Sequence, residues 1–156
     1  MSSATPTDLL LRPATPADAA AVTAVHLASR AAAVAAGAMP PGVHDDRAVG
    51  EWLAGRVSTD EVWVAEAGGE VVAYVRLTAQ WLDDLYVVPA QAGRGIGTAL
   101  LDLATVLRPD GFGLWVFETN VAARRFYAAR GLVEVERTDG ADNEERAPDV
   151  HLRWTP

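Results

Sequence analysis

The sequence predicts a fold of the α/β (α+β) type, in which helices flank a mixed central sheet. The first observation is a run of three strand-like segments between residues 62 and 88, interrupted by a glycine pair that is typical of a β-hairpin. The second is that two helical patterns precede this run and two follow it. The third is that helices and strands do not alternate regularly, so a purely parallel sheet is not expected.

The N-terminal third is predicted to contain an edge strand and two helices. Residues 9–12 form a short apolar run, which favours a strand. Thr15 can cap a helix that has Pro16 at its first position and ends near Gly37. A second helix is expected at residues 45–57, because large side chains recur there at helical spacing, at Val49, Trp52, Leu53 and Arg56.

Three strands are predicted in the middle of the chain. Residues 62–66 and 70–78 flank Gly68 and Gly69, which predict a hairpin turn between them. Residues 81–88 form the third strand. Pro89 ends it, because proline cannot donate to the strand ladder.

The C-terminal half is predicted to contain two more helices and three more strands. The first helix spans about residues 95–107, with a buried stripe at Leu100, Leu103, Ala104 and Leu107. A strand at residues 113–118 leads to a helix at residues 120–130, and Gly131 suits the position just after a helix C-terminus. The closing strands are expected at residues 132–136 and 150–154.

Length and composition indicate one domain. The chain has 156 residues, half of them hydrophobic, which is enough for one core. We expect a flexible tail at residues 1–8 and a single domain at residues 9–156. The chain has no cysteine, which excludes disulfides, thiolate zinc sites and a cysteine nucleophile, and favours a cytoplasmic location.

The charge balance argues against nucleic acid as a partner. Thirteen basic residues against twenty-one acidic ones give a net charge of −8, which repels phosphate backbones. This charge fits either simple solubility or the attraction of a cationic substrate. No membrane association is expected, because the alanine-rich residues 17–38 include Asp18, His26 and Arg30.

The strongest functional pattern is Gly93-Arg94-Gly95-Ile96-Gly97, which lies between a predicted strand and a predicted helix. Glycines at alternate positions let successive backbone N–H groups approach an anion closely. The start of the helix adds partial positive charge and unpaired donors. A pyrophosphate is therefore the expected ligand of this loop.

Two common phosphate-binding motifs do not fit the loop. A P-loop would end in Gly-Lys-Ser/Thr, which is absent here. A dinucleotide-binding loop would need a glycine at Leu100, with an acid such as Glu118 further on. Residues 89–92 also separate the strand from the first glycine by too much chain for that tight turn.

Two motifs together resemble the Gcn5-related N-acetyltransferase (GNAT) family over nearly the whole chain. The first is Leu85-Tyr86-Val87-Val88-Pro89, followed by the glycine segment and by Ala99-Leu100-Leu101. The second is Asn120-x-x-Ala123-x-x-Phe126-Tyr127-x-x-x-Gly131-Leu132. The resemblance implies a GNAT-like, mostly antiparallel sheet flanked by four helices, with two parallel strands that splay apart at the cofactor site.

The resemblance implies that acetyl-CoA is the cosubstrate. The family usually has Gln or Arg where this chain has Ala92, with Gln91 one residue earlier. Backbone amides supply most of the phosphate cradle, so binding is still expected, and Arg94 either adds a contact or lies solvated on the surface. The implied cofactor-binding residues are Leu85, Val87, Ala92, Gly93, Arg94, Gly95, Ile96, Gly97, Thr98, Asn120, Ala123 and Tyr127.

The resemblance also implies catalytic roles. The backbone of Leu85 and Val87 would bind the pantetheine arm, and the Leu85 N–H would stabilise the oxyanion. Tyr127 matches the family's proton donor to the departing thiolate, although a plain core role is the alternative. Asn120, Ala123 and Tyr127 are spaced to share one face of a helix.

The general base does not carry over from the family. Two branches place a glutamate at positions that here hold Trp81 and Trp115. Asp83 is the predicted base, because strand alternation puts it on the same face as Trp81, although a surface carboxylate is an equal alternative. Glu118 is a second candidate, and a bulge in the strand would exchange Asp83 for Asp84.

The sequence therefore predicts an acetyl-CoA-dependent N-acetyltransferase that acts by direct attack in a ternary complex. The expected acceptor is a primary amine of a small molecule, because acidic residues gather at positions 138–149 and tryptophans can wall a cleft. Trp81, Trp115 and Glu118 are the expected acceptor contacts. A solvated acidic loop is the alternative to an acceptor site.

Other functions stay open at this point. They are a non-catalytic acyl-CoA-binding or sensing module, a protein or peptide N-acetyltransferase and, more distantly, a nucleotide-binding oxidoreductase. No metal is expected, because His26, His44 and His151 lack ligand spacing. The family often forms homodimers through exposed strands, and the sequence does not decide whether this chain does.

Overall fold

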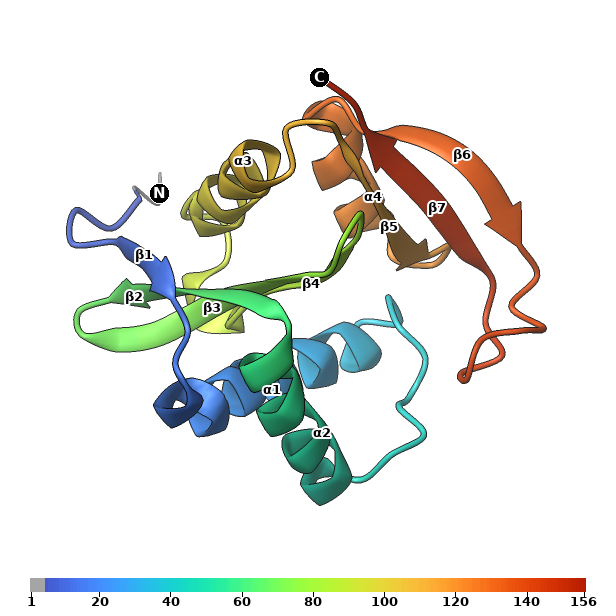
Figure 1. Cartoon of the computed structure of the whole chain (residues 1–156). Coiled ribbons are helices and arrows are strands. Elements are labelled where there is room, and N and C mark those ends of the chain that lie inside the picture. Colours follow the sequence, from blue (N-terminus) through green and yellow to red (C-terminus); the bar gives the residue numbers. More distant parts are fainter. Residues whose placement is uncertain (1–4) are drawn as a thin grey trace.

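The computed structural model describes residues 5–156, and within them seven strands and four helices follow the predicted order (Figure 1). Two short 3-10 turns, η1 (Pro16–Asp18) and η2 (Pro89–Gln91), precede α1 and α3. The elements are β1 (Leu10–Pro13), α1 (Ala19–Ala35), α2 (Asp46–Thr59), β2 (Glu61–Ala67), β3 (Glu70–Leu77), β4 (Leu82–Val87), α3 (Ile96–Leu107), β5 (Phe112–Phe117), α4 (Val121–Ala129), β6 (Val133–Thr138) and β7 (Asp149–Trp154).

The strands form two antiparallel sheets, one in the order β1-β2-β3-β4 and the other in the order β5-β7-β6. β4 and β5 are the neighbouring parallel strands. Within residues 5–156 they are joined by one bridge, between Trp81 and Gly113, where the Gly113 N–H donates to the Gln80 carbonyl at 2.9 Å. Beyond this bridge the two strands diverge (Figure 1), which confirms the predicted splay.

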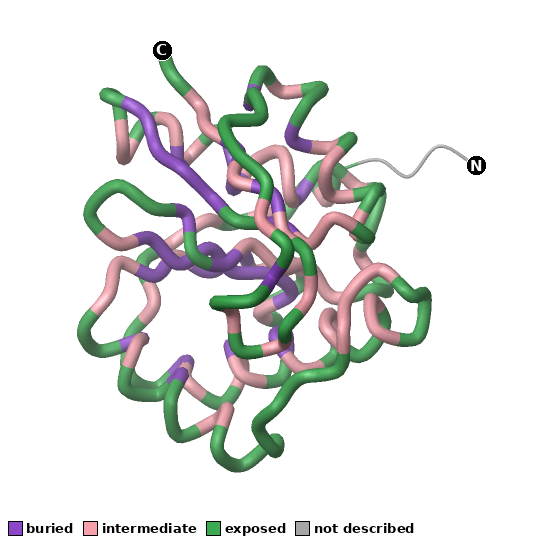
Figure 2. The backbone as a smooth tube through the Cα atoms, turned by 90° about the vertical axis from the view of Figure 1, so that its right-hand side faces the viewer, coloured by how far each residue is buried: buried purple, intermediate pink, exposed green. Residues whose placement is uncertain are grey.

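Helices cover both faces of the four-stranded sheet. α1 and α2 lie on one face, where Val22, Val25 and Val57 pack against Tyr74 of β3. α3 lies on the opposite face and buries Leu100, Leu101 and Ala104 (Figure 1). Figure 2 shows buried segments in the interior of the molecule and exposed segments around them. The core is therefore divided by the sheet into two parts, and the site described below lies where the sheet splits.

The β2–β3 hairpin and the N-terminal segment lie together. Of the expected tail at residues 1–8, residues 1–4 lie outside the described part of the chain. The Asp8 carboxylate accepts a hydrogen bond from the Gly68 N–H at 2.5 Å. Gly68 and Gly69 have φ of 61° and 79°, which confirms the predicted two-residue hairpin turn.

The first helix begins one turn later than predicted. Residues after Thr15 first form η1, and the Asp18 carboxylate accepts from the Thr15 N–H at 2.7 Å. Arg12 of β1 donates two hydrogen bonds to the same carboxylate, at 2.7 and 2.8 Å. The Arg12 guanidinium holds the pKa of Asp18 well below its usual range. This cluster fixes the corner between β1 and α1.

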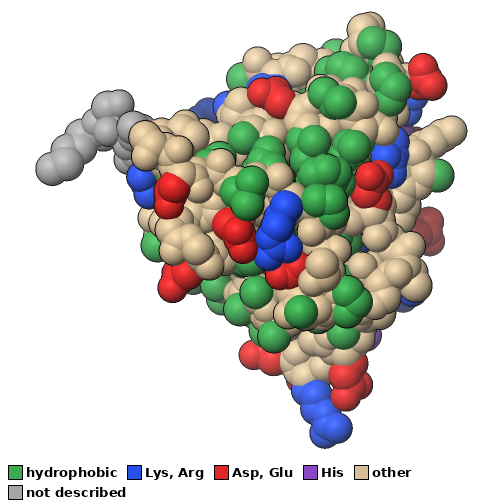
Figure 3. Space-filling model, turned by 60° about the vertical axis from the view of Figure 1, so that its left-hand side comes forward, with side chains coloured by type: hydrophobic (Ala, Val, Ile, Leu, Met, Phe, Trp, Pro, Cys, Tyr) green, Lys and Arg blue, Asp and Glu red, His purple; other side chains and the backbone are tan. Residues whose placement is uncertain are grey.

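The surface carries no broad basic patch on the face drawn in Figure 3, where acidic, basic and apolar side chains are interspersed. Such a face offers no continuous stripe of cations for a phosphate backbone. Among the helices of residues 5–156, none combines the length and the apolar character needed to cross a membrane.

Candidate active site

The glycine segment lies where the chain passes from β4 into α3. Gly93 and Gly95 have φ of 77° and 79°, a conformation that residues with a side chain rarely adopt. The first helical hydrogen bond runs from the Ala99 N–H to the Gly95 carbonyl at 3.0 Å. The N–H groups at positions 96–98 therefore have no acceptor within the helix and can bind an anion.

Phe126 of α4 and Arg130, which caps its C-terminus, contact the start of α3. The Thr98 hydroxyl accepts hydrogen bonds from Arg130 at 2.6 and 3.1 Å. A Cβ at Gly97 would lie 3.5 Å from the Phe126 ring, so Gly97 also allows close packing of α3 on α4. Arg94 donates to the Gln91 side chain at 2.7 Å. The sequence did not predict the packing role of Gly97 or the contribution of Arg130.

A cavity of about 210 Å³ lies between the diverging strands β4 and β5. Its wall includes Leu85 from β4 and the predicted helix face of Asn120, Ala123 and Tyr127 from α4. The Asn120 side chain accepts from the Ala123 N–H at 3.2 Å and so caps α4. We call this space the β4–β5 cavity. The structure thus brings Leu85, Asn120, Ala123 and Tyr127 to one cavity.

The open edge of β4 faces this cavity. The Val88 N–H donates to the Val72 carbonyl of β3 at 2.9 Å, so the backbone groups of Leu85 and Val87 point away from β3. The Val87 carbonyl accepts a hydrogen bond from the Ser29 hydroxyl of α1 at 2.9 Å. Sequence reasoning did not foresee this bond, which occupies one acceptor on the open edge.

Tyr127 is almost fully buried at the back of the β4–β5 cavity, with 8% of its surface exposed. Burial raises the pKa of the Tyr127 phenol well above its usual value, and Tyr86 and Asp84 raise it further. The hydroxyl therefore keeps its proton throughout the neutral pH range and can act only as a donor or as a neutral acceptor there.

A β-bulge in β4 changes the faces predicted for its two aspartates. In the β3–β4 register Arg76 pairs with Asp84 and Leu77 pairs with Leu82, so Asp83 is the extra residue. Leu82 therefore takes the core position on that side of the strand, and the alternation is interrupted at Asp83. Both aspartates still lie in the wall of the β4–β5 cavity.

The Asp83 side chain is exposed at the bulge and accepts a hydrogen bond from the Thr78 hydroxyl at 2.8 Å. Partial burial raises the pKa of Asp83, while the Thr78 hydrogen bond opposes that shift. Asp83 borders the β4–β5 cavity, on the side of β4 away from α1 and α2.

A second, larger cavity of about 520 Å³ lies on the α1 and α2 side of β4. Its wall includes His26 and Arg30 of α1, Trp52 of α2, and Asp84 of β4. We call it the α1–α2 cavity. Arg30 and Asp84 border both cavities, so the two spaces adjoin at β4.

Two connections close the outer side of the α1–α2 cavity. His44, between α1 and α2, lies 3.0 Å from the Glu144 carboxylate in the β6–β7 connection. The Arg30 guanidinium lies 3.9 Å from the Glu145 carboxylate of the same connection. The acidic segment therefore forms part of the cavity wall and is not a solvated loop without contacts.

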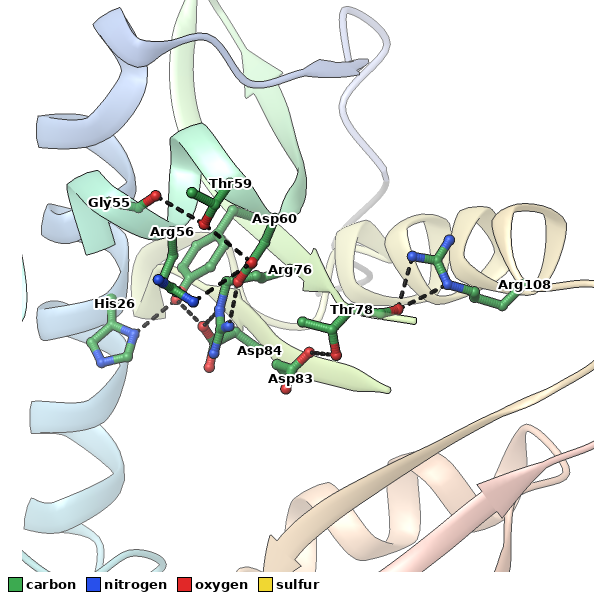
Figure 4. A network of polar contacts seen from close by, with 11 residues as sticks. His26, Gly55, Arg56, Thr59, Asp60, Arg76, Thr78, Asp83, Asp84 and Arg108 are labelled. Carbon is green, nitrogen blue, oxygen red and sulfur yellow. Dashed lines mark hydrogen bonds and ion pairs between the residues drawn. The ribbon is translucent and has the colours of Figure 1, made fainter. Parts of the chain in front are cut away.

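A buried polar network runs behind this cavity (Figure 4). The Tyr74 hydroxyl donates to Asp84 at 3.1 Å and lies 2.8 Å from Nδ1 of His26. Arg76 donates to Asp84 at 2.7 Å and to Asp60 at 2.8 Å. The side chains of Tyr74, Asp84, Arg76 and Asp60 are thus each engaged by another side chain of the network.

The structure separates the predicted acceptor contacts. Trp115 borders the β4–β5 cavity and stacks on Trp81, with ring centroids 6.5 Å apart. Trp81 itself sits at the bridge between the sheets and borders neither of the two cavities, and Glu118 borders neither. Within residues 5–156, no group of three His, Cys, Asp or Glu side chains is placed to hold a metal ion.

Sequence reasoning missed His26, Arg30 and Tyr74 as site residues. His26 and Arg30 are four residues apart on one face of an alanine-rich helix, and this polar pair was a usable signal. Tyr74 gave no such signal, because a tyrosine in an apolar strand is typical of a core residue.

Comparison with known proteins shows one family. Residues 33–132, more than half of the chain, match the sequence profile of the acetyltransferase (GNAT) family. An uncharacterized N-acetyltransferase of Archaeoglobus fulgidus is 35% identical over 97 residues, which are 53% of this chain and 65% of that protein. The match thus spans just under two thirds of that relative's length.

Solved structures share the whole fold. A GCN5-related N-acetyltransferase from Rhodopseudomonas palustris has a TM-score of 0.79 and 26% identity, covering 100% of this chain and 99% of that one. YncA from Salmonella typhimurium, solved with its cofactor acetyl-CoA, has a TM-score of 0.71 and 20% identity, covering 96% of this chain and 94% of that one. At that identity YncA supports the fold alone.

Proposed function

This chain belongs to the acetyltransferase (GNAT) family, and on that premise we propose that it transfers the acetyl group of acetyl-CoA to a primary amine of a small molecule. The observation that carries the proposal is that two cavities adjoin at β4 and share Arg30 and Asp84 in their walls. A thioester in the β4–β5 cavity and an amine in the α1–α2 cavity would meet there. Direct attack in a ternary complex requires that arrangement.

The residues beside the β4–β5 cavity suit acetyl-CoA. Its pyrophosphate would bind the N–H groups at positions 96–98, and its pantetheine arm would lie along the open edge of Leu85 and Val87. At Gly93 no atom lies within 4 Å of the missing Cβ, which leaves room for the phosphates. The further contacts proposed for the cosubstrate are Ala92, Arg94, Gly95, Asn120 and Ala123.

Two groups would act on the reacting thioester. The Leu85 N–H would donate to the oxygen of the tetrahedral intermediate, a role that can lower the barrier by about 3 kcal/mol. Tyr127 would donate its proton to the departing thiolate. The raised pKa of Tyr127 supports this role, because it keeps the donor form available at neutral pH.

The proton of the incoming amine needs an acceptor. Asp83, the base predicted from the sequence, remains one candidate, since its pKa is raised and a less acidic carboxylate is a better base near neutral pH. Asp83 borders only the cosubstrate side of β4. An acceptor within the α1–α2 cavity would lie nearer to the amine.

The wall of the α1–α2 cavity supports a cationic acceptor with an apolar body. Trp52 offers an aromatic face, while Glu144, Glu145 and Asp84 supply negative charge. The contact between His44 and Glu144 closes the outer side, which favours a small molecule over a peptide segment. A protein or peptide acceptor, or a binding module without turnover, would be recognised by the assay below.

The proposed function is tested by measuring release of the CoA thiol from acetyl-CoA across four classes of acceptor: small primary amines, amino-acid derivatives, basic peptides and anionic amines. We expect turnover to be fastest with a small cationic amine that has an apolar body. Fastest turnover with a basic peptide would mean that the acceptor is a peptide and not a small molecule. Binding of acetyl-CoA without thiol release in any class would leave a non-catalytic binding module.

A further inference from the structure

His26 occupies an unusual position for a core histidine. It lies on α1 and is 8% exposed. Its ring contacts Tyr74 of the buried network and also borders the α1–α2 cavity. Its Nδ1 edge faces Tyr74, which is fully buried behind it. The Tyr86 ring packs edge-on against the imidazole with centroids 5.0 Å apart. The ring is therefore held in one orientation from two sides.

The network determines which nitrogen of His26 carries the proton. The Tyr74 hydroxyl has one hydrogen, and it is donated to the Asp84 carboxylate. The Tyr74 oxygen must then accept from the Nδ1–H of His26, since these two atoms are 2.8 Å apart. Neutral His26 consequently has its lone pair on Nε2, on the edge of the ring opposite Tyr74.

Arg76 maintains the direction of this chain of hydrogen bonds. Its Nε donates to the same Asp84 oxygen that Tyr74 contacts, at 2.7 Å, and its other end is paired with Asp60. The Asp84 carboxylate oxygen accepts from both the guanidinium and the Tyr74 hydroxyl. The Arg76 guanidinium also lies under the Trp52 ring, 4.8 Å from its centroid, which ties the network to the wall of the α1–α2 cavity.

We propose that Nε2 of His26 is the general base of the acetyl transfer, held in the reactive tautomer by the chain Nδ1–H to Tyr74 to Asp84. The assignment rests on the proposed function, because it needs an amine in the α1–α2 cavity. His26 acts on the amine directly or through one water, and Tyr74 and Asp84 act as positioning residues.

The protons and bonds balance in this scheme. The ammonium form of the acceptor gives one proton to Nε2 of His26, which frees the nitrogen lone pair. That nitrogen attacks the thioester carbonyl, the C–N bond forms, and the C–S bond breaks. The thiolate takes the proton of Tyr127, and the N–H proton lost by the new amide restores the Tyr127 hydroxyl. His26 returns its proton to solvent, so the products are amide, CoA thiol and one proton.

Geometry favours His26 over the two aspartates of β4. One Asp84 oxygen already accepts from both Arg76 and Tyr74, so these two hydrogen bonds compete with any proton that an amine would give to it. Asp83 is bonded to Thr78 and does not border the α1–α2 cavity. Neutral imidazole is the proton acceptor best matched to neutral pH.

The charges around His26 set its pH behaviour. Groups that face it are Arg30 from α1, Tyr74 and Arg76 from β3, Asp84 and Tyr86 from β4, and, across the cavity, His44, Glu144 and Glu145. Burial lowers the pKa of His26 below its ordinary 6.5, with Asp84 opposing and Arg30 assisting the shift. The basic form of His26 therefore prevails at neutral pH, and kcat should fall once the pH drops below the lowered pKa.

The test compares the His26→Asn and His44→Asn variants with the wild type. Asparagine at position 26 can still donate to Tyr74 but has no counterpart of Nε2. We expect kcat at saturating substrates to fall about 10²-fold and to lose its decline toward low pH between about pH 8 and about pH 5. The His44→Asn variant removes the other histidine of the cavity and should keep the low-pH decline, whatever its effect on KM.

Two further measurements keep the assignment open to refutation. If His26→Asn unfolds, the His26→Ala variant is assayed with added imidazole, which should raise kcat at least about fivefold by occupying the vacated space. Imidazole should not stimulate the wild type or the Asp83→Asn variant. Absence of rescue, or a low-pH decline that survives in His26→Asn, would overturn the assignment.

Failure of the assignment and failure of the proposed function give different results. A wild type that releases no CoA thiol with any amine overturns the proposed function and this assignment with it. A wild type that is active, with a His26→Asn variant of normal rate and an Asp83→Asn variant that loses about 10²-fold, returns the role to Asp83.

Discussion

The β4–β5 cavity and the α1–α2 cavity lie on opposite sides of one strand, yet they are built differently. The first depends on main-chain features: a splayed edge, two glycines with positive φ, and the start of α3. The second depends on side chains that come from α1, α2, β4 and two long connections. The two sides adjoin only where Arg30 and Asp84 reach both cavities.

This difference explains how well each side could be predicted. A loop that needs positive φ selects glycine, and a helix start that binds phosphate follows its strand directly, so the requirements appear as short patterns. The acceptor side brings together Trp52 and Glu144, which are far apart in the sequence. Only tertiary packing makes them neighbours.

The largest effect is expected at Tyr127, and it separates chemistry from binding on the cosubstrate side. The Tyr127→Phe variant keeps the ring and loses the proton that the thiolate would take. We expect kcat to fall about 10²-fold, while the dissociation constant of acetyl-CoA changes less than about twofold. Steady-state kinetics with the best amine and calorimetry with acetyl-CoA measure the two quantities.

Tyr86→Phe is the matched control, because Tyr86 also borders the β4–β5 cavity and its hydroxyl accepts a long hydrogen bond from Arg30, at 3.5 Å. Its loss should cost less than about threefold in kcat, since no reacting atom depends on it. Equal losses in the two variants would show that a buried hydroxyl matters for packing alone, and Tyr127 would then be a core residue.

A smaller effect is expected at Gly95, and it tests whether the cosubstrate side is a backbone site. In Gly95→Val a residue with a side chain would have to keep a backbone φ of 79°. Its new Cβ would also lie only 2.7 Å from the Thr5 hydroxyl. We expect acetyl-CoA to bind at least about tenfold more weakly, so that most of the rise in Tm given by the ligand is lost.

Gly69→Val controls for the strain alone. Gly69 has the same φ of 79° but lies in the β2–β3 hairpin, with open space around its missing Cβ. Both variants should lose roughly 1–3 kcal/mol of stability. Only Gly95→Val should also lose the ligand-induced rise in Tm, and a Gly95→Val protein with the full rise would contradict the pyrophosphate assignment.

Asp83 and Asp84 of β4 show which features of the site the sequence could not decide. The element order was predicted because hairpin glycines and helix caps act locally, and the splay was expected from the family resemblance. The bulge at Asp83 was only an open alternative, because it depends on how Arg76 and Asp84 pair across the sheet. An alternating pattern cannot reveal an extra residue in a strand, and so the aspartate beside the buried network was assigned the weaker role.

The smallest effect is expected in the acidic β6–β7 connection, and it tests whether the acceptor side selects cations. Glu144 and Glu145 border the α1–α2 cavity, where Glu144 contacts His44 and Glu145 lies near the Arg30 guanidinium. In a Glu144→Gln/Glu145→Gln variant the positive charge of Arg30 would be left facing the acceptor. We expect KM for a cationic amine to rise about threefold, with kcat nearly unchanged, because the effect is on binding and is partly screened. For the wild type, kcat/KM should fall as salt is added, and the variant should show a weaker salt dependence.

The matched control is Glu70→Gln/Glu136→Gln, which changes the net charge equally at two exposed positions that border neither cavity. If both double variants shift KM alike, the overall charge of the protein attracts the amine and the cavity wall does not select it. An unchanged KM in the Glu144→Gln/Glu145→Gln variant, or a preference for anionic amines, would remove the cationic acceptor from the proposal and leave acetyl-CoA binding on the other side of β4 intact.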